Sequence, residues 1–159
     1  MTEEKMCCPK FDPTPWENKE ITWNDKMFVK DTTICFMHIP LNIGAMMKRI
    51  WGKVEKAGAG PDMKDWVMLS DESSLWKGIH YLAVSKEVPD AENLKISGTF
   101  LTRVFEGPYK DAGKWYKQMQ DLALEKKVET KKIYFYYTTC PKCAKKWGKN
   151  YVVGFLQIR

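Results

Sequence analysis

The chain has 159 residues, of which 44% are hydrophobic and 13% aromatic, with seven each of Trp, Tyr and Phe. This length suits one core, and the composition excludes disorder and is rich in rings. The formal net charge is +6, and the excess is C-terminal, since residues 110–159 hold 12 Lys or Arg against four Asp or Glu. No nucleic-acid-binding motif accompanies it, so we interpret the charge as a solvated surface and expect no nucleic-acid partner.

The N-terminus is polar and acidic, and no apolar run approaches the roughly 18 residues of a membrane span, so we expect a cytoplasmic protein without membrane association. The first 22 residues form a proline-rich arm, with Pro9, Pro13 and Pro15, that favours extended chain. Regular structure is expected from Trp23, and residues 33–39 predict a buried strand.

Two similar sets of elements follow. Apolar side chains recur on one helical face from Ile43 to Val54, and Gly58 ends this helix. Residues 65–69 and 78–84 predict two strands joined by a polar turn.

The second set begins with a predicted strand over residues 96–105. Gly107 and Pro108 open a second helix, and residues 132–138 and 151–158 predict two more strands. One face of the second helix carries Tyr109, Ala112, Tyr116, Met119 and Ala123.

The order strand, helix, strand, strand therefore occurs twice, over about residues 23–88 and 94–159 of a single domain spanning 23–159. We predict an α+β fold in which the tandem β-α-β-β repeat forms one antiparallel sheet, with two main helices on one face and a ligand cleft at the seam.

The stretch Phe105-Glu106-Gly107-Pro108-Tyr109, followed by an amphipathic helix, resembles the GyrI-like small-molecule-binding domain family. The likeness extends over about residues 30–159. It implies a domain that binds and sequesters lipophilic, aromatic, cationic compounds on stacked rings beside a glutamate, as in multidrug resistance. An alternative within the same family is a hydrolase of cyclopropane-bearing genotoxic molecules. No DNA-binding domain precedes the stretch and the strand over 151–158 lacks a carboxylate, so a free-standing protein with its acid elsewhere is expected.

Alternation along residues 133–137 places Tyr134 and Tyr136 on one face of the strand, with Phe135 and Tyr137 on the other. We expect the first pair to line the pocket, since a ring face attracts a cation. The predicted ligand-binding residues are Trp16, Trp66, Met68, Trp76, Tyr81, Phe105, Glu106, Tyr109, Tyr134 and Tyr136.

Glu106 is the preferred counter-charge, and the catalytic acid if the protein is an enzyme, although its place before a helix equally suits a dipole interaction. Glu72 and Glu17 are the other candidates. His38 is interpreted as a core histidine. Trp51 and Trp115 lie on or beside helical core faces and are interpreted as packing residues.

Five cysteines without an export signal are expected to be reduced. Cys140 and Cys143 form a CxxC pair, which could be turn residues, a thiol-redox pair, or a structural zinc site completed by Cys7 and Cys8. We expect no cofactor, and keep the zinc- or thiol-dependent protein as a second alternative. Cys35 is expected to be inert core.

Overall fold

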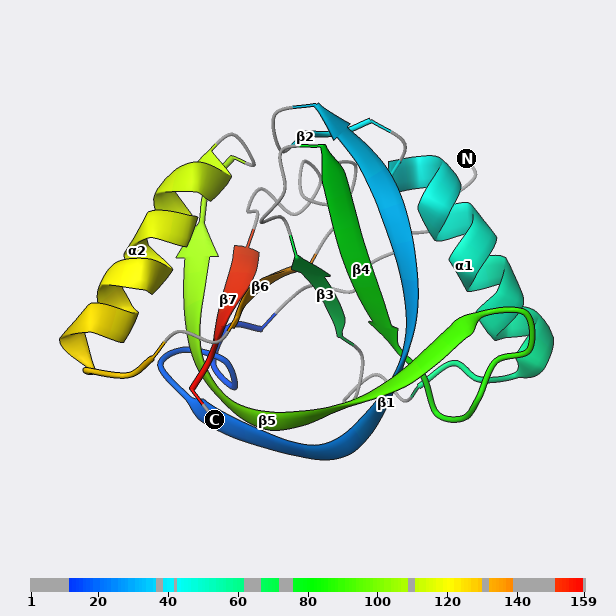
Figure 1. Cartoon of the computed structure of the whole chain (residues 1–159), viewed down its shortest axis with the longest axis horizontal. Coiled ribbons are helices and arrows are strands. Elements are labelled where there is room, and N and C mark those ends of the chain that lie inside the picture. Colours follow the sequence, from blue (N-terminus) through cyan, green and yellow to red (C-terminus); the bar gives the residue numbers. More distant parts are fainter. Residues whose placement is uncertain are drawn as a thin grey trace, which may run out of the picture. The chain divides into compact units, whose positions relative to one another are not determined.

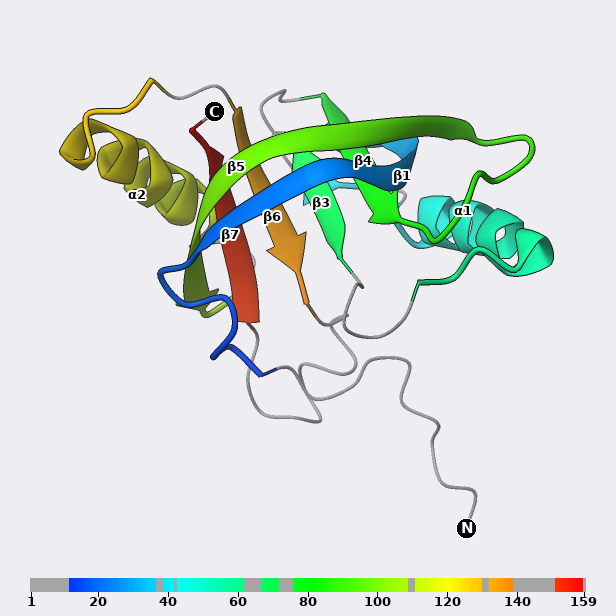
Figure 2. The same ribbon diagram turned by 90° about the horizontal axis from the view of Figure 1, so that it is seen from below.

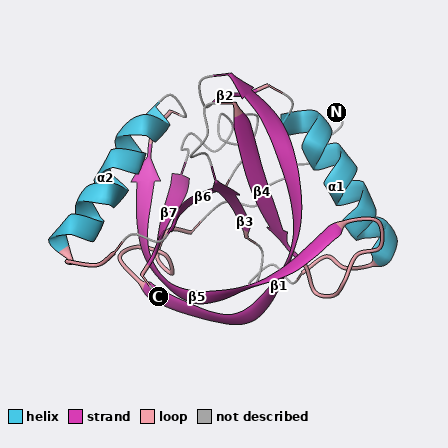
Figure 3. Cartoon of the chain, viewed as in Figure 1, coloured by secondary structure: helices cyan, strands magenta, loops and turns pink. Residues whose placement is uncertain are grey.

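The computed structural model describes residues 12–36, 39–41, 43–61, 67–71, 76–108, 111–129, 132–138 and 151–158. These residues form a small α+β protein (Figures 1 and 3). Its elements are β1 (Glu20–Phe36), β2 (Ile39–Pro40), α1 (Ile43–Ala57), β3 (Met68–Asp71), β4 (Lys77–Ala83), β5 (Glu92–Glu106), α2 (Ala112–Glu125), β6 (Lys132–Tyr137) and β7 (Tyr151–Gln157). Neither helix is long and apolar enough to cross a membrane.

The chain divides into two compact units. One comprises residues 22–98, and the other residues 99–159 with the N-terminal residues up to 21. They are called here the 22–98 unit and the 99–159 unit. Strand β5 contributes to both, and Gly98, with a φ of 153°, lies where it passes from one to the other. That backbone conformation favours glycine, because it has no Cβ.

In the 22–98 unit the antiparallel strand order is β2-β1-β4-β3. The register joins Phe28 to Ala83 between β1 and β4, and Met68 to Leu82 between β3 and β4. Helix α1 packs its apolar face on this sheet. The buried residues of this core are Val29, Met46, Ile50, Val54, Ala59, Leu82, Val84 and Val88.

Strand β1 begins at Glu20 and so is far longer than the predicted strand over residues 33–39. Its two-residue apolar pattern is interrupted at Asp25, which has a φ of 52° and donates its N–H to Ser97 Oγ at 2.8 Å. Strand β1 pairs with β5 beside this kink. Because the kink interrupts the alternation, the sequence pattern does not predict the first part of β1. Figure 2 shows the two long strands side by side.

In the 99–159 unit the order is β6-β7-β5, also antiparallel. Helix α2 covers one face, and Met119 packs so closely on Gly154 of β7 that a Cβ there would lie 2.8 Å from its Sδ. The buried residues of this core are Phe105, Trp115, Met119, Leu122, Ala123, Ile133, Phe135, Val152 and Leu156.

The predicted first helix and its end at Gly58 are confirmed, as are the strands matched by β6 and β7. The second helix starts later than predicted. It begins at Ala112, and Asp111 at its N-cap donates its N–H to the carbonyl of Pro108 at 3.0 Å. The α+β class holds, while the twofold repeat and its seam stay predictions.

Candidate functional site

Strand β6 presents different rings on its two faces. Ile133 and Phe135 belong to the core under α2, and Tyr137 packs beside them. Because side chains alternate along a strand, Tyr134 and Tyr136 lie on the opposite face. The predicted division of the four consecutive rings is therefore confirmed.

Two phenylalanines from the neighbouring strands join this second face. Phe100 of β5 lies 6.3 Å from Tyr134 and 6.1 Å from Phe155 of β7, measured between ring centroids. Phe155 stands directly opposite Tyr134 in the register. All four rings are at most 5% exposed. We call this cluster of Phe100, Tyr134, Tyr136 and Phe155, together with Trp16, the ring face.

Trp16 reaches the ring face from the segment that precedes β1. Its ring meets Tyr136 edge-on at 5.9 Å and Phe155 edge-on at 5.6 Å. Thr102 of β5 holds this segment, because its hydroxyl donates to the carbonyl of Trp16 and its backbone N–H donates to the carbonyl of Lys19 at 2.8 Å. The predicted residue Trp16 is thus brought to Tyr136 by contacts that the sequence pattern does not reveal.

Charged groups lie at the two ends of the ring face. The Nζ of Lys132 is 5.4 Å from the Tyr134 centroid, within the range of a cation–π contact. At the far end of β5, alternation places exposed Glu106 on the same face as Phe100 and Thr102. The rings therefore lie between a cation and a carboxylate.

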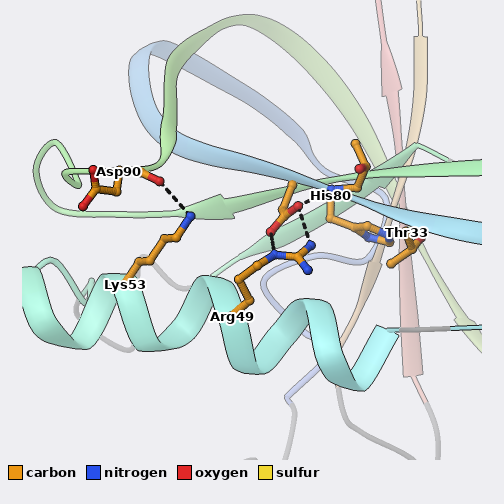
Figure 4. A network of polar contacts seen from close by, with 7 residues as sticks. Thr33, Arg49, Lys53, His80 and Asp90 are labelled. Atoms are coloured by element: carbon orange, nitrogen blue, oxygen red, sulfur yellow. Dashed lines mark hydrogen bonds and ion pairs between the residues drawn. The ribbon is translucent and has the colours of Figure 1, made fainter.

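The 22–98 unit holds a buried polar network on its α1 side (Figure 4). His80 Nδ1 is 2.8 Å from Ser70 Oγ, and His80 Nε2 is 2.9 Å from Thr33 Oγ1. Burial lowers the pKa of His80 to about 4, so the ring is neutral at pH 7. Ser70 is 1% and His80 3% exposed, and both ring nitrogens are partnered, which indicates a structural histidine rather than a base that reaches a substrate.

An ion pair lies next to this network. Arg49 of α1 donates to both carboxylate oxygens of Asp31, at 2.9 and 2.8 Å, and this holds the pKa of Asp31 below its usual value. Nearby on α1, Lys53 donates to the carbonyl of Asp90 at 2.7 Å (Figure 4). These contacts fasten α1 to β1 and to the turn before β5.

The other predicted residues are dispersed. Met68 packs in the α1 core, whereas alternation puts buried Tyr81 on the opposite face of the same sheet. Trp76 is 60% exposed and meets Phe36 edge-on. Phe105 stacks on Trp115 under α2 at 5.7 Å, so it faces away from Tyr134 and Tyr136.

Several predicted residues lie outside the described residues: Trp66, Tyr109, Glu72, His38, Cys7, Cys8, Cys140 and Cys143. Trp51 and Trp115 pack in the two cores, as predicted, and Cys35 is buried. Within the described residues, no cluster of His, Cys, Asp and Glu could hold a metal ion.

Sequence reasoning missed Phe100, Phe155, Thr102 and Lys132. The signal for the first three was their period-two spacing with neighbouring apolar residues, but only the strand register assembles them on one face. Asp71 was missed as well. It is 5% exposed at the end of β3, on the Tyr81 face of its sheet, where a buried carboxylate is uncommon.

A family model described as "Bacterial hydrolase" matches residues 1–158. No curated protein matches the chain. Among solved structures, SAV2435 bound to tetraphenylphosphonium is 12% identical with a TM-score of 0.54, and the match covers 90% of this chain and 94% of that chain. A protein from Staphylococcus aureus MU50, described provisionally as a bacterial transcription regulation protein, is 10% identical with a TM-score of 0.53, over 91% and 99% of the two chains. At these identities the likeness establishes a shared fold.

Proposed function

The chain belongs to the bacterial hydrolase family, and we propose that it binds lipophilic aromatic cations on the ring face and sequesters them. Hydrolysis of such a compound at the same place is the second candidate. The observation that carries the proposal is a cluster of five rings that already accepts one ammonium group, that of Lys132 over Tyr134.

The chemistry of the ring face suits this class of ligand. The π face of a tyrosine attracts a cation without requiring directional hydrogen bonds, so compounds of different shape can bind. Trp16 meets Tyr136 and Phe155 edge-on, and a ring of a ligand could pack against the cluster in the same edge-to-face manner. Glu106 at one end, with Glu17 next to Trp16, supplies carboxylates for the ligand charge.

The shared fold adds support. SAV2435, which has this fold, was solved with tetraphenylphosphonium, a lipophilic cation surrounded by four phenyl groups. A protein of the same fold with an aromatic cluster of its own is a reasonable candidate for the same class of ligand, and the proposal for this chain rests on its own rings.

The family description favours the second candidate. Hydrolysis of a cyclopropane-bearing compound would join the oxygen of water to one ring carbon and break a carbon–carbon bond. The electron pair and the proton lost by water would pass to the conjugated acceptor of the substrate. Glu106 could take this proton from water and pass it to the acceptor, and the rings could exclude bulk solvent from the reacting carbon.

Fluorescence titration with tetraphenylphosphonium tests binding. Tyr136→Leu should weaken binding about fivefold or more, because a desolvated cation–π contact and a ring surface are lost. Tyr137→Leu is the matched control, since its side chain lies on the α2 face of the same strand. Equal losses in the two variants, or no binding by the unmodified protein, would contradict the proposal.

Product analysis with a cyclopropane-bearing alkylator separates the two candidates. Ring-opened product that requires the protein and disappears in Glu106→Gln, with binding retained, would favour the hydrolase. Binding without product would leave sequestration as the function.

A further inference from the structure

The ring face carries its own cation. Lys132 is the first residue of β6, it is half-buried, and its ammonium lies 5.4 Å from the centroid of the Tyr134 ring. Tyr134 in turn contacts Phe100 and stands opposite Phe155. The ammonium group of Lys132 thus lies over Tyr134, one of the rings on which we propose that a cationic ligand stacks.

We infer that Lys132 sets the charge selectivity of the ring face, because an external cation must displace its ammonium from Tyr134. This inference rests on the proposed function and adds a residue that opposes it. Two positive charges cannot share the π face of Tyr134 at low cost, because they repel each other more strongly in a partly dehydrated site than in water. An anion of the same shape would instead be attracted to Lys132.

The strand register gives this effect a direction. Lys132 pairs with Gln157, which pairs with Phe100, at one end of the three-stranded sheet. Glu106 pairs with Tyr151 at the other end. A bound cation is therefore favoured toward the Glu106 end, and the Lys132 end is the less favourable half of the face.

Tetraphenylphosphonium and tetraphenylborate provide the test, because they have nearly the same shape and opposite charge. Titrations compare the unmodified protein with Lys132→Met and Lys132→Arg. Lys132→Met should bind the phosphonium roughly two- to fivefold more tightly and the borate more weakly, as expected for loss of one cation–π contact and one charge. Lys132→Arg keeps the charge above the ring and should bind both ions as the unmodified protein does.

Lys26→Met is the matched control. The Nζ of Lys26 lies 5.7 Å from the centroid of Trp23, and both residues belong to the 22–98 unit, so this variant loses the same charge and the same kind of contact in the other unit. Opposite shifts for the two ions in Lys132→Met that are absent in Lys26→Met, both measured at 0.15 M salt to weaken the general effect of a lost charge, would support the inference. Identical shifts in the two variants would overturn it, while phosphonium binding itself remained. Failure of every variant to bind either ion would overturn the proposed function and the inference together.

Discussion

The two units solve the same packing problem with different chemistry. Each places one helix on one face of an antiparallel sheet. In the 22–98 unit the helix side includes polar groups, with His80 between Thr33 and Ser70 and an ion pair beside it. In the 99–159 unit the core under α2 is apolar, and the notable chemistry lies on the opposite face, among rings.

The difference is between a polar network that is satisfied within the protein and the rings on which we propose that a ligand binds. Both nitrogens of the His80 ring are already hydrogen-bonded inside the protein. The network can therefore stabilise the packing of this unit, but the His80 ring has no hydrogen-bonding atom left for a ligand. The rings need no partner of fixed geometry, and one of them already holds a cation. Titratable residues alone direct attention to the 22–98 unit, whereas we propose binding in the 99–159 unit.

Acid should lower the free energy of unfolding through His80 of the 22–98 unit, and this is the largest effect we expect. The pKa of His80 is about 4 in the folded chain, because burial disfavours the charged ring, and near 6.5 when unfolded. Above pH 6.5 both states are neutral and the stability is complete. Between about pH 6.5 and 4 the unfolded chain takes up the proton, so the free energy of unfolding should fall by about 3 kcal/mol.

Urea unfolding at a series of pH values measures this loss. A His80→Asn variant is less stable at pH 7 and should show a smaller decrease between pH 6.5 and 4. The Asp31 carboxyl, whose pKa is lowered by Arg49, contributes stability that is fully present above its usual pKa of 3.8 and is lost only below that value, so its effect falls in a separate pH range. A pH dependence unchanged by His80→Asn would show that the network does not exclude the proton.

Two strand glycines sharpen the comparison. A Cβ at Gly78 would lie 2.5 Å from Thr33 Oγ1 and 3.0 Å from His80 Nε2, whereas at Gly154 the nearest atoms belong to flexible Met119. Gly78→Ala should therefore destabilise the protein by about 2 kcal/mol, and Gly154→Ala by about 1 kcal/mol. Gly113→Ala, where nothing lies within 4 Å, is the control and should be stabilising. Equal losses of stability in Gly78→Ala and Gly154→Ala would mean that Thr33 and His80 move aside for a methyl group as readily as the Met119 side chain does.

Local sequence patterns predicted the first helix and the alternation of rings along β6. The helix ending at Gly58 and the alternating rings of β6 depend on periods of 3.6 and two residues, which act over short distances. The contact of Trp16 with Tyr136 could not be predicted, because it joins residues far apart in the chain through the hydroxyl of Thr102. The packing of Phe105 on Trp115, under α2, could not be predicted for a related reason. Its motif position says nothing about which sheet face α2 would cover.

Removing the Thr102 hydroxyl should loosen the ring face without disturbing the core under α2. Thr102→Val deprives the Trp16 carbonyl of its donor and should cost about 1 kcal/mol. Acrylamide quenching of tryptophan emission should rise, and a Trp16→Phe background should abolish that rise. Thr102→Ser keeps the hydroxyl and should resemble the unmodified protein. Quenching that does not change in Thr102→Val would mean that ring contacts alone hold Trp16.

The smallest change in stability is expected for substitutions at the C-terminal ends of the two helices. Both end in the same pattern, with Ala59 N–H donating to Val54 and Val128 N–H donating to Ala123, but the left-handed residue is Gly58 after α1 and Lys127 after α2. A Cβ at Gly58 would meet only Lys86 Nζ at 3.8 Å, so conformation rather than space decides the outcome. Lys127→Gly should stabilise the protein by about 0.5 kcal/mol, since relief of the strain exceeds the added freedom of the unfolded chain, and Gly58→Ala should destabilise it by about 1 kcal/mol. Urea unfolding of both variants measures the pair, and a destabilised Lys127→Gly would indicate that the lysine side chain, not the backbone, stabilises that end.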